Sequence, residues 1–270
     1  MGITHLSGLQ VAGVPTQGIS GLPVGNTYFW VDSVNGSNGN PGTFDAPYAS
    51  LATALSACTA NAGCVIVLKQ SHAESIASAT ALAFSVAGVQ IVGLGTGANR
   101  PTFTFTTANT ATIAVSASSV SISNCIFVGN FLSIASCFTL TTAPNFSVDS
   151  CAFRDTSAVL GFLSIITTTV SVNSDGLSFT NNVVQSDATT TPGPTIVVAN
   201  TLDRLTILYN YIVHSTISNN TSALLAHGAL VVTHLWMEGN RVYSVNTDTA
   251  TGGLLITTSA ITGSGIAGTD

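Results

Sequence analysis

Short runs of alternating apolar and polar residues fill most of this chain, and one such run recurs five times. The copies are SVSISNCIF (119–127), FSVDSCAF (146–153), LSFTNNVV (177–184), LTILYNYIV (205–213) and LWMEGNRVY (235–243). Their central apolar residues are spaced 26, 31, 28 and 30 positions apart, and they are Ile122, Val148, Phe179, Ile207 and Met237. Alternation with a period of two indicates strands with one apolar face. An irregular repeat of this length indicates a solenoid.

The repeat extends beyond these five copies. Ile91 in VQIVGLG and Val67 in CVIVLK continue the series upstream. A weaker strand pattern alternates with the main one, at TATIAV (110–115), CFTLTT (137–142), FLSIITT (162–168), PTIVVAN (194–200), ALVVTH (229–234) and GLLITTS (253–259). Each coil therefore holds at least two strands, and stacked coils pair their backbones with one another. The pattern predicts an all-β parallel β-helix. A β-sandwich is the alternative fold, but it does not explain the recurring phrase.

Asparagine recurs just after the main strand of several coils. The positions are Asn124, Asn182, Asn210 and Asn240, with Ser150 replacing Asn in one coil. Asparagine tolerates left-handed backbone, and its amide bonds neighbouring backbone groups. We expect these residues to form a structural ladder at a bend of the coils, and a polar groove for a ligand is the alternative.

The five cysteines are an odd count and show no disulfide framework. Cys125 and Cys151 follow the ladder position in consecutive coils, so we expect stacked, buried, reduced thiols. A metal pair or a bridge is the alternative there. Cys58 and Cys64 are expected to stay unbridged, because a chain without an export signal folds in a reducing cytosol.

Residues 27–63 are predicted to cap the solenoid, since an open strand edge invites aggregation. They contain a strand, a turn-rich loop (NGSNGNPG, 35–42) and a helix opened by Pro47. The helix carries one apolar stripe, made of Leu51, Ala54, Leu55 and Cys58. Coils are expected over 64–260, an extended glycine-rich docking arm over 1–26, and a tail over 261–270.

The loop of the cap offers oxygen ligands of the kind that calcium prefers, at Asp32, Asn35, Asn38 and Asp45. It lacks the alternating acid spacing and the closing Glu of a known calcium loop. We predict no metal and no cofactor.

Charged residues make up only 6% of the chain against 46% hydrophobic residues, and the net charge is −6. Ser, Thr, Asn and Gly must therefore cover the surface. Five Lys and Arg residues are too few for clustered phosphate contacts or a polybasic anchor. No stretch reaches the roughly 18 apolar residues of a membrane helix, and the N-terminus is not a secretory signal. We predict neither a nucleic-acid nor a membrane partner.

The segments FWVDSVNGSNGNPGTFDAPYASLATAL (29–55), KQSHAESI (69–76) and VAGVQIVGLGTGANRPTFTF (86–105) carry a resemblance. Together they resemble the opening of right-handed parallel β-helix (pectin-lyase-like) virion proteins of tailed bacteriophages. The resemblance covers residues 28–245. It implies a head decoration, spike or tail part that is usually a homotrimer bound to other virion proteins. Such a protein folds in the host cytoplasm and leaves by lysis, which explains the missing signal.

Lyases, polygalacturonases and tailspike depolymerases share this fold, so motifs must decide the chemistry. Asn246, Thr247 and Asp248 match one polygalacturonase tripeptide, but the Asp-Asp, Gly-His-Gly and Arg-Ile-Lys motifs are absent, and His227 with Gly228 is only a fragment. A glycosidase needs two carboxylates about 5–9.5 Å apart. By contrast, Asp149 and Glu238 lie three coils, or about 14 Å, apart.

The remaining titratable residues are expected to be structural. Arg154 with Asp155 and Asp203 with Arg204 are expected to be solvated corners. His72 and Glu74 are expected to form a capped turn, and a catalytic couple is the alternative. His214 and His234 end strands without acidic neighbours in sequence. We predict no catalytic residue.

The sequence thus predicts a non-enzymatic virion surface protein, a head decoration that docks through its N-terminal arm. The alternative is a tail spike or fibre that binds or cleaves host polysaccharide, with a lyase or hydrolase site shared between subunits. A host surface glycan is then a further partner. Exposed aromatic and acidic residues gathered along one ladder would favour this alternative. A bacterial adhesin is the remaining possibility, disfavoured by the missing export signal.

Overall fold

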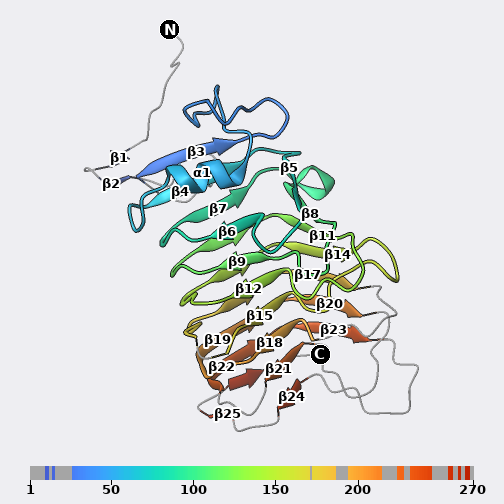
Figure 1. Ribbon diagram of the computed structural model, residues 1–270. Coiled ribbons are helices and arrows are strands. Elements are labelled where there is room, and N and C mark those ends of the chain that lie inside the picture. Colours follow the sequence, from blue (N-terminus) through green and yellow to red (C-terminus); the bar gives the residue numbers. More distant parts are fainter. Residues whose placement is uncertain are drawn as a thin grey trace.

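The computed structural model describes residues 26–170, 172–186, 194–214, 224–227 and 232–244, together with short strands at 10–11, 14–15, 255–257, 261–262 and 265–267. The chain winds into a parallel β-helix whose coils stack in one column, with the N-terminal cap at one end (Figure 1). This confirms the predicted fold class. Full coils carry three strands each, so three parallel sheets run along the column.

The three sheets are numbered here in the order in which a coil visits them. Sheet 1 contains β3 (Thr27–Val31), β4 (Cys64–Leu68), β7 (Gln90–Gly93), β10 (Ser121–Ser123), β13 (Ser147–Asp149), β16 (Ser178–Thr180), β19 (Leu202–Leu208), β22 (Val232–Glu238), β25 (Ile261–Thr262) and β26 (Gly265–Ala267). Sheet 2 contains β5 (Ala73–Ile76), β8 (Thr102–Phe105), β11 (Ile126–Gly129), β14 (Ala152–Asp155), β17 (Val183–Ser186), β20 (Tyr211–His214) and β23 (Arg241–Ser244). Sheet 3 contains β6 (Leu82–Phe84), β9 (Ile113–Val115), β12 (Phe138–Leu140), β15 (Ile166–Thr168), β18 (Ile196–Val198), β21 (Leu225–His227) and β24 (Leu255–Thr257).

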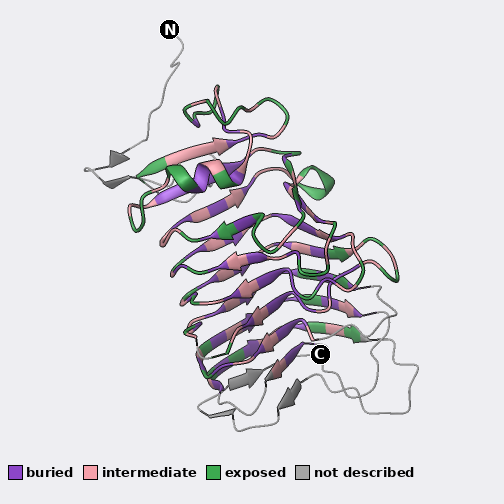
Figure 2. Ribbon diagram, viewed as in Figure 1, coloured by how far each residue is buried: buried purple, intermediate pink, exposed green. Residues whose placement is uncertain are grey.

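The register of sheet 1 follows the repeat read from the sequence. The central apolar residues are direct partners from coil to coil, in the order Ile91, Ile122, Val148, Phe179, Ile207 and Met237. Along the strands, buried and partly exposed residues alternate (Figure 2). The alternation therefore places one apolar residue of each coil in the same inward column.

Two strand positions differ from the expectation. Ile66, not Val67, pairs with Ile91, because all five residues of β4 are buried and alternation cannot mark its inward face. ALVVTH (229–234) is not the third-sheet strand of its coil. Val232 already opens β22, and the third-sheet strand is β21. That apolar run merges with the alternation of β22, so the sequence does not separate the two strands.

Phenylalanines fill the core of the earlier coils. Phe103, Phe127 and Phe153 stack inside sheet 2 with ring centroids 5.5 and 5.0 Å apart. Phe138 meets Phe127 edge-on at 5.1 Å and Phe146 at 5.4 Å. All five are fully buried, and burying each contributes roughly 2–3 kcal/mol. Later coils continue the same inward column with Val184, Ile212 and Val242.

The capping helix α1 (Leu51–Ala57) lies against β3, β4 and β6. It begins after Ser50 rather than at Pro47, because the Thr53 amide donates to the Ser50 hydroxyl and the Leu51 amide donates to Glu74. Leu51, Ala54 and Leu55 of the predicted apolar stripe are buried, whereas Cys58 follows the last helical residue and is half-buried. A short 3₁₀ turn, η1 (Gly97–Asn99), follows β7.

The cysteines divide into one bridge and three free thiols. Cys58 and Cys64 form a disulfide that ties the end of α1 to the first coil, so the expectation of unbridged cysteines is wrong. Cys125, Cys137 and Cys151 are free and buried. Burial raises the pKa of the Cys151 thiol to about 12 and holds the pKa values of the other two well above their usual range. These thiols stay protonated at neutral pH.

The short strands β1 (Gln10–Val11) and β2 (Val14–Pro15) pair antiparallel near the start of the chain. The rest of the arm predicted for 1–26 (apart from position 26), and parts of the tail predicted for 261–270, lie outside the described residues. In the described part of the chain, no helix is long and apolar enough to cross a membrane.

Candidate functional site

A two-residue bend joins sheet 1 to sheet 2 in the five coils that begin with β10, β13, β16, β19 and β22, and it fixes where nearby side chains point. The first bend residue has left-handed backbone, with φ between 54° and 63°, and the residues are Asn124, Ser150, Asn181, Tyr209 and Gly239. The second bend residue is buried, and the residues are Cys125, Cys151, Asn182, Asn210 and Asn240. Residues on either side of the bend therefore face solvent from two different sheets.

The structure brings three of the four candidate asparagines into one buried ladder. Asn210 donates through Nδ2 to Asn240 Oδ1 at 2.8 Å and to the Phe179 carbonyl at 2.9 Å. Its own Oδ1 accepts from the Asn182 amide at 2.9 Å. Asn124 is not part of this ladder. It occupies the first bend position and donates to the carbonyl of Gly93 at 2.8 Å.

Cys125 and Cys151 take the ladder position in the earlier coils. The prediction treated the two bend positions as one because asparagine suits both. The first position needs left-handed backbone, and the second needs an amide that satisfies buried backbone groups.

Tyr209 occupies the first bend position, where other coils place Asn, Ser or Gly. A left-handed conformation costs such a residue roughly 1–2 kcal/mol. Its ring fits because the next coil has Gly239, where a Cβ atom would fall 2.3 Å from the ring. The Tyr209 hydroxyl donates to Glu238 Oε1 at 3.2 Å, and Trp236 Nε1 donates to Glu238 Oε2 at 3.2 Å. Both rings are more than half exposed.

We call Tyr209, Trp236 and Glu238 the corner cluster. Its strands, β19 and β22, lie far from the cap in the column (Figure 1). Hydrogen bonding and charge from Glu238 raise the pKa of the Tyr209 phenol, so the phenol stays a donor at neutral pH. The cluster therefore presents two rings and a carboxylate with fixed relative orientation.

The four preceding coils place small hydroxyl residues where β22 has Trp236. That column reads Ser121, Ser147, Ser178, Thr206 and then Trp236. From β10 to β22, this outward column therefore changes from hydroxyl residues to an aromatic ring only at β22. Sequence reasoning missed the cluster, although aligning the coils one residue before their central position would have shown the change from Ser and Thr to Trp.

A tyrosine pair lies on the other side of the bend, on sheet 2. Tyr211 and Tyr243 are exposed by 41% and 56%, and their ring centroids are 5.5 Å apart. Exposed aromatic rings therefore flank the bend on both outer faces of the last coils.

Asp203 and His234 form a second polar group on β19 and β22. Asp203 Oδ1 lies 2.6 Å from both His234 Nδ1 and Thr233 Oγ1, and Arg204 reaches Oδ2 at 3.2 Å. Hydrogen bonds from Thr233 and His234 lower the pKa of Asp203, so its carboxylate accepts and Nδ1 donates. The side chain of His234 is 67% exposed, so its second ring nitrogen, Nε2, can form a hydrogen bond with a ligand hydroxyl. This pair could not be recognised from the sequence, because its two members are 31 residues apart.

His72 and Glu74 support the cap. His72 is buried; its Nδ1 accepts from the Ser33 amide at 3.0 Å, and its Nε2 lies 2.9 Å from Glu74 Oε1. Glu74 also accepts from the Leu51 amide at the start of α1. Both ring nitrogens are engaged inside the protein, as a structural role requires.

Three of the four candidate calcium ligands, Asp32, Asn35 and Asn38, are hydrogen-bonded within the cap. Asp32 accepts from the amides of Val34 and Asn35, at 2.9 and 3.2 Å. Asn38 Oδ1 accepts from the amides of Ala49 and Ser50, both at 3.1 Å. Among the residues with described placement, no group of three His, Cys, Asp or Glu side chains is arranged to hold a metal ion.

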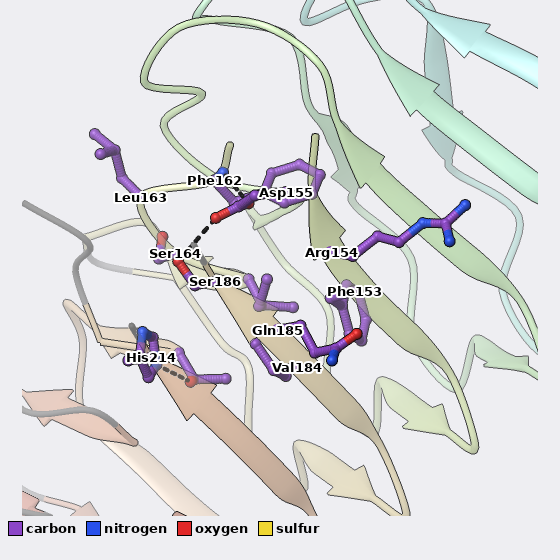
Figure 3. A pocket seen from close by; sticks show the side chains of 12 residues that line it. Phe153, Arg154, Asp155, Phe162, Leu163, Ser164, Val184, Gln185, Ser186 and His214 are labelled. Atoms are coloured by element: carbon purple, nitrogen blue, oxygen red, sulfur yellow. Dashed lines mark hydrogen bonds between the residues drawn. The ribbon is translucent and has the colours of Figure 1, made fainter. Parts of the chain in front are cut away.

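A small pocket with mostly apolar lining lies at the C-terminal ends of β14, β17 and β20, where Asp155, Ser186 and His214 stand (Figure 3). Asp155 accepts from the Phe162 amide at 3.0 Å and from the Ser186 hydroxyl at 2.8 Å, and His214 lies 3.5 Å from the Thr195 hydroxyl. The cavity of about 10 Å³ has room for one water and not for a sugar. The expectation of a solvated Arg154–Asp155 corner is thus half wrong, since Asp155 faces this pocket while Arg154 is exposed.

The other acids are separate, as their coil positions implied. Asp149 and Glu238 share a column with Thr180 and Leu208 between them. Asp149 is bonded to Thr180 Oγ1 at 2.6 Å and to Asn181 Nδ2 at 2.8 Å. The tripeptide at 246–248 and the side chain of His227 lie outside the described residues.

Comparison with known proteins gives structural likeness only. No family model matches the chain, and no curated protein sequence matches it. Among solved structures, it is similar to a rhamnogalacturonan lyase with 14% identity and a TM-score of 0.46, covering 88% of this chain and 68% of that one. It is also similar to the pectate lyase Pel9A (12%, TM-score 0.42, covering 92% and 79%). A third is the GH136 lacto-N-biosidase from Eubacterium ramulus (11%, TM-score 0.37, covering 88% and 55%).

These neighbours correct one expectation. The sequence predicted a protein without enzymatic activity, whereas the three similar structures named above are two lyases and a biosidase. The prediction of a non-enzymatic protein is therefore contradicted and is not retained. The neighbours have names that denote action on carbohydrates.

Proposed function

We propose that the chain binds glycans through the outer face of its last described coils. The observation that carries this proposal is the corner cluster, in which two exposed rings are held by one carboxylate. A pyranose presents an apolar C–H face and a rim of hydroxyl groups. An aromatic ring takes the face, and a carboxylate accepts hydrogen bonds from the rim.

The cluster is also prepared for binding before a ligand arrives. Glu238 fixes Trp236 and Tyr209 through hydrogen bonds, so less side-chain freedom is lost on binding. Three earlier coils carry serine where Trp236 stands, so the fold does not need a ring there. Exposed aromatic surface without a structural need is typical of a contact site.

Asp203 and His234 lie on the same two strands and give the face a group able to exchange protons. Binding is therefore tested together with cleavage. The full chain and Trp236→Ala are applied to a glycan array, and bound oligosaccharides are then incubated with the chain and analysed by mass spectrometry. We expect Trp236→Ala to lose the signals of the parent chain, and Ser121→Ala, the matched control in an earlier coil, to keep them.

Two results would contradict glycan binding through the corner cluster. One is an array with no signal for the parent chain. The other is a change in sedimentation, but not in glycan signal, on Trp236→Ala, which would make the corner cluster an interface with a second copy. Shortened products in the mass spectra would place the binding site in an enzyme.

We further propose that this glycan-binding chain is a homotrimer on the surface of a tailed-phage virion, attached to other virion proteins through residues 1–26. The resemblance of residues 29–55 and the sparsely charged surface support this placement. So does the Cys58–Cys64 disulfide, a bond that persists on exposed particles.

Quantitative mass spectrometry of purified virions tests the placement. A copy number near that of the capsid protein makes the chain a head decoration, and a few copies make it a tail spike or fibre. Absence from the particle would contradict the virion proposal.

A further inference from the structure

We propose that the outer face of sheet 2 carries an anion-binding groove that takes the carboxylate or sulfate group of an acidic glycan. The groove has a volume of about 220 Å³ and lies between η1 and the strands β11, β14 and β17. Its lining includes Ala98, Arg100, Ile126, Arg154, Val183 and Gln185. This inference rests on the proposed glycan binding and names the class of glycan.

The charge of the groove is unusual for this chain. Arg100 and Arg154 are two of only five Lys and Arg residues in a protein with a net charge of −6. No Asp or Glu residue lines the groove. A concave site with two guanidinium groups and no carboxylate attracts an anion even though the whole molecule repels it.

Arg100 is held in place by the backbone. Its Nε donates to the Gly97 carbonyl at 3.2 Å, and one terminal nitrogen donates to the Ser150 carbonyl at 3.2 Å. A guanidinium has five N–H donors, so three remain for a ligand. A guanidinium fixed in this way binds an anion with little loss of side-chain freedom.

Arg154 is exposed, and it extends away from Asp155 and Ser186 (Figure 3). Within the described part of the chain it forms no ion pair. The nearest acids in sequence are engaged elsewhere: Asp155 is bonded in the inner pocket, and Asp149 is bonded on sheet 1. Arg154 is therefore available for a bidentate contact with a carboxylate or sulfate.

The rest of the groove suits a sugar ring. Val183 and the buried Ile126 provide apolar surface, and Gln185, the strand partner of Arg154, provides an amide. The two outward columns continue to the tyrosine pair, because Val183 is the partner of Tyr211, and Gln185 leads through Val213 to Tyr243. Arg154 and Tyr243 are three coils apart, about 14 Å. One glycan chain along sheet 2 can therefore reach both.

Calorimetric titration of the full chain tests the groove with three probes. A hyaluronan oligosaccharide supplies carboxylates, a chondroitin sulfate oligosaccharide adds sulfates, and the same hyaluronan oligosaccharide with its carboxylates reduced to alcohols is the neutral match. We expect the neutral probe to bind at least tenfold more weakly than its acidic parent. We expect Arg154→Gln and Arg100→Gln each to weaken the acidic probe about tenfold and leave the neutral probe unchanged.

Two further variants separate charge from folding. Arg154→Lys keeps the charge but loses the bidentate fork, so it should fall between the parent chain and Arg154→Gln. Thr104→Ala, on the same outward column two coils earlier, should change nothing. Whichever acidic probe responds more to Arg154→Gln identifies the anion.

The outcomes distinguish the groove from the corner cluster. The groove is overturned if the acidic and neutral probes bind with equal affinity, or if neither arginine variant weakens the acidic probe. The proposed function still stands in that case if Trp236→Ala abolishes binding. Acidic binding that depends on Arg154 and not on Trp236 supports the groove and overturns the corner cluster. Equally tight binding of a single-stranded oligonucleotide would overturn the assignment to a glycan.

Discussion

The earlier coils, from β8 to β14, and the later coils, from β17 to β23, place their aromatic side chains on opposite sides of the same wall. In sheet 2 the inward column changes from Phe103, Phe127 and Phe153 to Val184 and Ile212. On sheet 1, one outward column changes from Ser and Thr to Trp236. On sheet 2, the outward columns of Val183 and Gln185 reach Tyr211 and Tyr243. Register and bend geometry stay the same through this change.

This difference shows that the fold requires only that inward apolar residues alternate with outward residues. It does not determine which side chain stands at an outward position. Inward rings stabilise the coil they occupy, because their surface leaves water. Outward rings remain about half exposed and gain less from burial, and at Tyr209 the backbone is in the costly left-handed region. Rings kept outside on adjacent coils are therefore best explained by a ligand. The predictions below test this division, from the largest expected effect to the smallest.

Truncating an inward ring should destabilise the fold most. Phe127 is fully buried between Phe103 and Phe153, so Phe127→Ala should lower the free energy of unfolding by about 3–5 kcal/mol. Tyr243→Ala, which removes an outward ring, should stay within about 0.5 kcal/mol. Urea unfolding followed by circular dichroism measures both. If both variants lost a similar free energy of unfolding, the distinction between inward and outward rings would be contradicted.

Substituting the second bend residue should lower the stability of the fold more in the later coils than in the earlier ones. Asn210→Ala removes the acceptor for the Asn182 amide and the donor to the Phe179 carbonyl. Leaving such buried groups unpaired costs about 1–3 kcal/mol each. Cys151→Ala, at the same position in an earlier coil, removes only a weakly bonded thiol and should cost less. Thermal unfolding of both variants decides the order, and a larger loss for Cys151→Ala would contradict it.

Removing the exposed indole should affect binding rather than folding. Trp236→Ala is expected to weaken an oligosaccharide found on the array at least tenfold, equivalent to about 1.4 kcal/mol. Ser121→Ala, in the same column, should leave its affinity unchanged. Calorimetric titration gives both affinities. A parent-like affinity for Trp236→Ala would remove the indole from the binding site.

The smallest effect concerns the phenol of Tyr209. Its pKa is raised in the folded chain by Glu238, so the hydrogen bond is fully present below the ordinary tyrosine value of 10.0. It is lost as the pH rises through the raised pKa. In Glu238→Gln the phenol should ionise at lower pH. Ultraviolet absorbance of phenolate, compared with Tyr209→Phe to assign the signal, follows this titration. An identical Tyr209 titration in both chains would show that Glu238 does not hold the phenol.

Most of the fold could be predicted because the sequence of each coil contains the same alternation of apolar and polar residues and recurs after a similar length. The register from Ile91 to Met237 follows from that signal. In β4, where all residues are buried and no alternation is visible, the predicted inward residue was wrong by one position. The start of α1 was missed because Glu74, a residue of the next coil, helps to cap it.

The candidate site could be predicted only in part, since its contacts join different coils. His234 meets Asp203, and Tyr209 meets Glu238, across about one turn of the solenoid. Asp155 faces inward because the side chains of β14 alternate between inward and outward directions. The prediction treated Asp155 and Arg154 as one exposed corner because the two residues are adjacent in sequence. The change from serine to tryptophan in one column was visible in the sequence once the register was known.

Fluorescence of Trp236 tests the central claim most directly, because the chain has only two tryptophans. In a Trp30→Phe variant, Trp236 is the sole reporter, and it can be titrated with an oligosaccharide that binds on the array. We predict a saturable change in emission, with a midpoint equal to the dissociation constant measured by calorimetry. Binding without any change in Trp236 emission would place the glycan elsewhere and contradict the account.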